Sequence, residues 1–166
     1  MRVVVMGVTG CGKSTVGASL AQRIGAEFAD ADDFHPASNV AKMTAGIALT
    51  DADRWPWLEE VASWLASRDE AVVACSALKR SYRDLLRAVA GDVMFVHLAA
   101  PQSVLEPRVR LRAERDGHFA PPGLLDSQYA TLEPLEPDEP GGAVDVETAD
   151  AAAVTDAALH LVAGRP

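Results

Sequence analysis

The eight residues 7–14 carry the strongest chemical signal in the sequence. They are G-V-T-G-C-G-K-S and match G-x-x-x-x-G-K-[ST], the pattern of a phosphate-binding loop (P-loop). Glycines let the backbone turn its N–H groups towards phosphate oxygens, the lysine reaches the β- and γ-phosphates, and the serine hydroxyl can ligate Mg²⁺. We therefore predict a nucleoside triphosphate site made by Gly7, Val8, Thr9, Gly10, Cys11, Gly12, Lys13, Ser14 and Thr15.

Three aspartates supply the acidic groups that phosphoryl transfer requires. Asp30, Asp32 and Asp33 directly follow an expected strand over 27–29. The carboxyl ends of parallel strands face the ligand crevice of α/β proteins. We expect Asp30, together with Ser14, on the Mg²⁺ side and Asp32 as the acceptor of a hydroxyl proton. The alternative is an ordinary solvated acidic turn.

Cations gather in two further places along the chain. Lys79, Arg80 and Arg83 follow an expected strand over 71–75, where they could bind an anionic acceptor through ammonium groups or guanidinium forks. Four more arginines stand between 108 and 115, and three of them share one face of an expected helix. Such arginines can close over phosphates and stabilise developing charge. A solvated basic helix face is the alternative.

An alternating pattern of strands and helices must position these groups. Short apolar runs over 3–6, 27–29, 71–75, 93–98 and 144–146 predict strands, and the segments between them have helical spacing. Such a pattern indicates a three-layer α/β domain, a parallel sheet of roughly five strands with helices on both faces.

Several details of the connecting segments are also predicted. We expect 36–50 to be irregular or loosely helical, Pro56 to lie in the first turn of the next helix, and Ser103 with Glu106 to form a capping box. Prolines and glycines in 116–142 bracket a short helix over 124–132. This stretch is expected to be a mobile lid or, alternatively, a plain surface loop.

Length and composition exclude several classes of protein. The 166 residues suit one domain, 1–166. With 15 Lys and Arg against 24 Asp and Glu, a net charge of −9 argues against nucleic-acid binding. We also expect no membrane span and no signal peptide, because the apolar runs are too short. Two cysteines provide no disulfide framework, which favours the cytoplasm.

A small kinase fits these features better than a nucleotide-dependent switch. A switch that reads guanine would carry Asn-Lys-x-Asp after a strand, and that tetrapeptide does not occur in the sequence. The sequence resembles the small P-loop gluconate kinases, relatives of shikimate kinase and the nucleoside monophosphate kinases. The residues that carry the resemblance are 7–14, 30–36, 39–43, 46, 49, 51–54, 56–58, 75–80, 82–87, 117–119, 124–128 and 132–134.

The resemblance implies ATP-dependent phosphorylation of D-gluconate to 6-phosphogluconate, with Mg²⁺, in a homodimer. It implies an acceptor-binding segment over 36–60 and a lid over about 116–142. Catalysis is assigned to Lys13, Asp32 and Arg115, and gluconate binding to Asp32, His35, Lys42, Arg54, Lys79, Arg83, His118 and Gln128.

The sequence leaves some choices open. Asp33 stands where the family has an apolar residue, so it competes with Asp32 for the role of base. The resemblance also does not settle which arginine of 108–115 contacts the transferred phosphoryl group. Another small hydroxy acid, such as shikimate, remains the alternative substrate, and a non-catalytic nucleotide-binding switch the alternative class.

Overall fold

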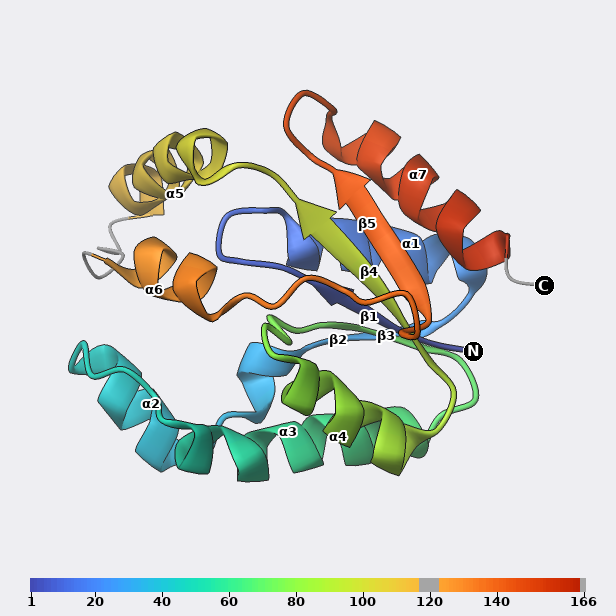
Figure 1. The fold of residues 1–166 in the computed structure, drawn as a ribbon, viewed down its shortest axis with the longest axis horizontal. Coiled ribbons are helices and arrows are strands. Elements are labelled where there is room, and N and C mark those ends of the chain that lie inside the picture. The colour runs from blue at the N-terminus through green and yellow to red at the C-terminus, as the bar shows by residue number, and fades with distance from the viewer. Residues whose placement is uncertain (117–122, 165–166) are drawn as a thin grey trace.

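The computed structural model describes residues 1–116 and 123–164, and Figure 1 shows their arrangement. Its elements are β1 (Arg2–Met6), α1 (Lys13–Ile24), β2 (Glu27–Asp30), the 3-10 helix η1 (Ala31–Phe34), α2 (Ala37–Thr44), α3 (Asp51–Ala66), β3 (Ala71–Ala74), α4 (Arg80–Ala90), β4 (Val93–Ala99), α5 (Gln102–Asp116), α6 (Leu124–Thr131), β5 (Gly141–Asp145) and α7 (Ala151–Ala163). The five strands form one parallel sheet in the order β2-β3-β1-β4-β5.

Two apolar cores cover the two faces of this sheet. The alternation of side chains along β1 sends Val3 and Val5 into the core beneath α1 and α7, and Val4 and Met6 into the core beneath α3 and α4. The four side chains are fully buried. The predicted three-layer α/β fold with a five-stranded parallel sheet is therefore confirmed (Figure 1).

Two helices begin elsewhere than the sequence predicted. Thr50 and Asp53 form a capping box that starts α3 well before Pro56, so the proline lies inside the helix and not in its first turn. Ser103 lies inside α5, which begins at Gln102, so the predicted capping box with Glu106 is wrong. The segment expected to be irregular or loosely helical contains α2, an eight-residue helix.

The carboxyl ends of the strands meet at one end of the sheet. The helices α2, α5 and α6 gather at this end, on the left of Figure 1, while α1, α3, α4 and α7 flank the sheet itself. The helix predicted over 124–132 is present as α6. None of the helices in the described part of the chain has the length and apolar character that a membrane crossing requires.

Candidate active site

The P-loop joins β1 to α1 along the floor of the site. Gly12 caps α1 with a left-handed backbone (φ 96°), which a glycine adopts at little cost. Because Gly12 has no side chain, the first N–H groups of α1 remain available to an anion. Gly10 also tolerates no larger residue, since a Cβ there would meet the Val109 side chain of α5 at 2.6 Å. The loop is thus built for close approach to both α5 and a ligand.

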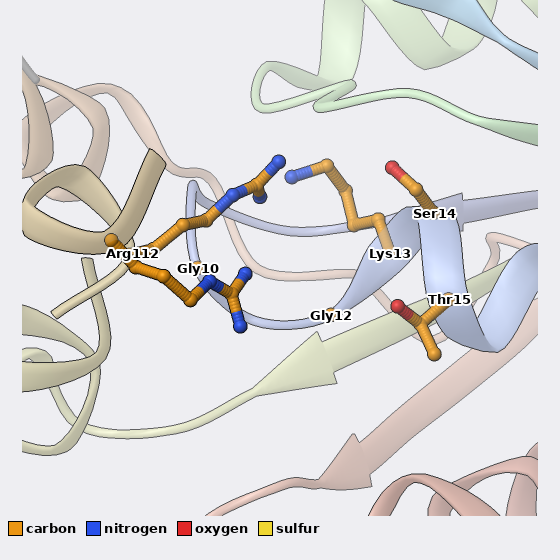
Figure 2. Close-up of a pocket in the computed structure, with 7 residues that line it drawn as sticks. Gly10, Gly12, Lys13, Ser14, Thr15 and Arg112 are labelled. Atoms are coloured by element: carbon orange, nitrogen blue, oxygen red, sulfur yellow. The ribbon is translucent and has the colours of Figure 1, made fainter. Parts of the chain in front are cut away.

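A cavity of about 340 Å³ opens above this loop. It is lined by Gly10, Gly12, Lys13, Ser14, Thr15, Arg112 and Arg115. Figure 2 shows Arg112 extending from α5 over the loop, and Arg115 of the same helix lines the same cavity. A polar cavity with three cations beside a helix N-terminus suits a polyphosphate. The structure thus brings Arg115 into the predicted nucleotide site and adds Arg112 to it.

Arg108, on the same helix, bonds the protein backbone. Its guanidinium donates to the backbone carbonyls of Val146 (3.0 Å) and Glu147 (2.9 Å). These carbonyls belong to the connection between β5 and α7. Arg108 therefore fastens α5 to that connection and does not line the cavity above the P-loop.

Two internal contacts occupy the P-loop in this structure. Lys13 Nζ donates to the carbonyl of Val8 at 3.0 Å, and the N–H of Thr9 donates to Gln128 Oε1 of α6 at 2.6 Å. This bond takes one of the three donors of the Lys13 ammonium group. Gln128, predicted to bind gluconate from the lid, instead reaches the P-loop backbone.

The first aspartate after β2 is joined to the P-loop helix. Ser14 Oγ donates to Asp30 Oδ2 at 2.5 Å, while Asp30 Oδ1 accepts the Asp32 N–H at 3.1 Å. Within the described residues no three His, Cys, Asp or Glu side chains cluster as a metal site. A hydroxyl and a carboxylate nevertheless fit Mg²⁺, which takes few protein ligands when phosphates and water complete its shell.

Asp32 is an open acid, with its side chain 87% exposed. The protein packed around the site raises the pKa of Asp32 by desolvation, and the neighbouring charge of Asp30 raises it further. A carboxylate with a raised pKa is a better proton acceptor than an ordinary aspartate. Asp33 is exposed on the same 3-10 helix, so both predicted candidates for the base lie at this edge.

His35 lies against this acid but is buried. Its side chain is 5% exposed and stacks on Trp57 with ring centroids 4.3 Å apart. His35 Nε2 lies 3.9 Å from Asp32 Oδ1. Burial lowers the pKa of His35 even though Asp32 acts to raise it, which favours the neutral ring.

The remaining predicted acceptor cations gather around the first turn of α3. Lys79 Nζ contacts both carboxylate oxygens of Asp51 (2.8 and 3.0 Å), and Arg54 lies 3.8 Å from the same acid. Lys42 pairs with Asp53 at 2.6 Å. The hydrogen bond from Lys42 is the main cause that lowers the pKa of Asp53 to about 2. The first turn of α3 thus collects three of the predicted gluconate ligands.

The prediction that Arg83 binds gluconate is wrong. Arg83 is fully buried, and its guanidinium is held by the Glu139 carboxylate and by backbone carbonyls. A side chain with its donors so occupied cannot reach a substrate. His118 lies outside the described residues.

Three side chains of the site were not predicted from the sequence. Tyr82 donates its hydroxyl to Asp51, Trp57 supports His35 and bonds the Ala31 carbonyl, and Asn39 contacts His35. Trp57 also belongs to the apolar core, with 3% exposure. An uncharged asparagine in a segment expected to be irregular carries no chemical signal of its own.

Comparison with known proteins places the chain among described relatives. A family model described as an AAA domain matches residues 3–135. A gluconokinase of Gluconobacter oxydans is 48% identical over 142 residues, covering 83% of this chain and 78% of the relative. The thermosensitive gluconokinase of Escherichia coli is 41% identical, covering 82% of this chain and 73% of the relative.

Solved structures agree with this result. A gluconokinase from Sinorhizobium meliloti superposes with a TM-score of 0.89 at 47% identity, covering 98% of this chain and 91% of the other. A shikimate kinase from Acinetobacter baumannii, in complex with shikimate, reaches a TM-score of 0.67 at 21% identity, covering 98% and 93%. The latter similarity concerns the fold alone.

Proposed function

The chain belongs to the gluconokinase family, and from this membership we infer that it is a kinase that transfers the γ-phosphoryl group of ATP to D-gluconate. The observation that supports this most directly is the juxtaposition at one end of the sheet. A phosphate-binding cavity lies beside an open aspartate, and cations suited to a carboxylate stand around α3. The products are 6-phospho-D-gluconate and ADP.

The P-loop binds the triphosphate in this proposal. Its backbone N–H groups and the N-terminus of α1 contact the phosphates, and Lys13 moves from the Val8 carbonyl to their oxygens. Arg112 and Arg115 line the same cavity and stabilise the charge of the transferred phosphoryl group. Ser14 and Asp30 would hold Mg²⁺, which supplies charge neutralisation on the phosphate oxygens.

Asp32 acts as the base for the acceptor hydroxyl. Its carboxylate is open, and its raised pKa favours uptake of a proton as the hydroxyl oxygen attacks phosphorus. Lys79 and Arg54 bind the gluconate carboxylate, and Lys42 and His35 contact the hydroxylated chain. Because Lys79 and Arg54 already surround Asp51, they form a site shaped for a carboxylate.

One assay tests the activity and its alternatives. ADP release is measured with Mg-ATP and a panel of D-gluconate, other aldonates, neutral sugars and shikimate. We expect release that depends on gluconate. Turnover with shikimate alone would identify the alternative substrate, and no acceptor-dependent turnover at all would overturn the proposal.

Variants test the roles of individual residues. Lys13→Ala should abolish turnover without changing the circular dichroism spectrum, whereas Arg23→Ala, on the same helix and paired with Asp156, should remain active. Asp32→Asn should lose at least 100-fold in kcat, the range of general-base catalysis. Asp33→Asn is its matched control, and a greater loss there would make Asp33 the base.

Assembly and location extend the proposal. We propose a homodimer in solution, which light scattering after gel filtration would distinguish from a monomer. A cytoplasmic location accords with two free cysteines, Cys11 and Cys75, both buried and neither in a disulfide.

A further inference from the structure

Asn39 is a buried amide of α2 that joins two parts of the acceptor segment. Asn39 is only 2% exposed. Asn39 Nδ2 donates to the backbone carbonyl of Asp53 at 2.9 Å and lies 3.3 Å from His35 Nδ1. A carbonyl oxygen can only accept a hydrogen bond, so it requires the nitrogen of the Asn39 amide, and not its oxygen, to face this side. The orientation of the amide is therefore fixed by the main chain of α3.

The amide orientation in turn determines where His35 carries its proton. The amide nitrogen has two hydrogens, and after one bonds Asp53 the second is available to His35 Nδ1. A neutral imidazole has one N–H and one acceptor nitrogen. Since Nδ1 accepts from Asn39, the proton of His35 resides on Nε2. This nitrogen is the one that lies 3.9 Å from Asp32 Oδ1.

We propose that Asn39 is a positioning residue that holds His35 in the Nε2–H tautomer and so presents a hydrogen-bond donor beside Asp32. The inference rests on the proposed role of Asp32 as base. A separation of 3.9 Å is too long for a direct hydrogen bond but admits a hydroxyl oxygen that contacts both groups. The reacting hydroxyl donates its proton to Asp32 and accepts the Nε2–H of His35, which stabilises negative charge on the attacking oxygen.

The surroundings of His35 keep this arrangement stable near neutral pH. Trp57 covers the ring, Asp32 is the acid that faces it, and Arg54 is the cation that acts on it. The effects of burial and of Arg54 outweigh that of Asp32 and lower the pKa of His35. The opposite tautomer would place an unprotonated Nε2 next to the Asp32 carboxylate, which offers the reacting hydroxyl two acceptors and no donor.

The tautomer can be observed directly, without an activity assay. Long-range ¹H–¹⁵N correlation of protein labelled at its four histidines reports which ring nitrogen is protonated, and His35→Gln assigns the signal by its disappearance. We expect the Nε2–H pattern for His35 at pH 7.5 in the wild-type protein. An Nδ1–H pattern would overturn the proposal, even if gluconate proved not to be the substrate.

Asn39→Asp provides the complementary test. A carboxylate at this position can only accept, so it should draw the proton of His35 to Nδ1 and invert the spectrum. We expect kcat to fall on the order of 10- to 100-fold, the loss seen when partners that orient metal-bound histidines are removed, with KM for ATP unchanged. Ser38→Ala, an exposed neighbour on α2, is the control and should alter neither. Full kcat in a folded Asn39→Asp protein with an inverted spectrum would contradict the catalytic part of the proposal.

Discussion

The buried ion pair between Arg83 and Glu139 should dominate the local stability of the segment between α6 and β5. Both side chains are 0% exposed, and Glu139 accepts from Arg83 Nε at 2.6 Å and from Nη2 at 2.9 Å. The other donors of Arg83 reach backbone carbonyls in 77–78 and 133–134. One guanidinium therefore ties the connection after β3 to the chain that leads into β5.

Glu139→Gln should cost about 3 kcal/mol in the free energy of unfolding. Removing one partner of a buried pair costs about 3–5 kcal/mol, because the other charge remains buried without compensation. Glutamine keeps the shape and one acceptor oxygen, so the lower end of that range applies. At about 2–4 °C per kcal/mol for a chain of this size, Tm should fall by about 6–12 °C.

The pH dependence of the effect follows from the pKa of Glu139. Burial alone would raise this pKa, but the hydrogen bonds from Arg83 and from the Glu136 N–H, with the charges of Arg83 and Arg80, together lower it. A lowered folded-state pKa contributes stability that is present above the unfolded value and is lost as the pH falls through the folded value. The difference between wild type and Glu139→Gln should therefore be full at pH 7 and shrink only in acid.

Urea unfolding followed by tryptophan fluorescence and far-UV circular dichroism measures this difference. Asp138→Asn is the matched control, because Asp138 is an exposed acid of the same segment that pairs with Arg80 at the surface. It should leave the midpoint nearly unchanged. A Glu139→Gln protein no less stable than the Asp138→Asn protein would refute the reasoning, as would a difference that grows towards low pH.

Three further experiments test other parts of the molecule. In the pH profile of kcat/KM, activity should fall on the acidic side with an apparent pKa above the ordinary aspartate range, because the raised pKa of Asp32 makes the base take up its proton at a higher pH. Asp33→Asn should move this fall to lower pH, because the charge of Asp33 contributes to raising the pKa of Asp32. Arg108→Ala should speed hydrogen exchange of the amides at 146–147 by releasing two carbonyls. Trp57→Phe should cost about 1–3 kcal/mol on urea unfolding, because it leaves a buried carbonyl of η1 without its indole donor.

The sequence predicted the elements whose signals are local. A P-loop needs its glycines, lysine and serine at fixed spacing within eight residues, and β1 needs only a continuous apolar run before them. The carboxyl ends of parallel strands face one crevice, which predicts that Asp30, at the end of its strand, lies on the side of the P-loop. In the structure Ser14 donates a hydrogen bond to Asp30, so the two side chains are neighbours.

Features that depend on a distant partner were missed. Arg83 occupies the same face of α4 as Leu86 and Ala90, all of them buried, while Val89 is 47% exposed. Helical spacing therefore contained a sign that position 83 points into the core. The residue type argued against burial, because a buried arginine is rare unless it is paired. The partner of Arg83 is Glu139, which lies 56 residues away in a segment with no strand or helix signal.

In the proposed site, the acids of α3 hold the cations that would bind an anionic substrate to a protein with a net charge of −9. Lys79 and Arg54 already surround the carboxylate of Asp51, and Lys42 is paired with Asp53. An incoming carboxylate therefore exchanges one set of ion pairs for another and does not neutralise bare charges. Such an exchange has a small net electrostatic gain. Selectivity for the substrate must therefore come from contacts to groups other than its carboxylate, because Asp51 already offers a carboxylate to the same cations. In the proposed site, those contacts would be made to the hydroxylated chain, at the end where Asp32 and His35 lie.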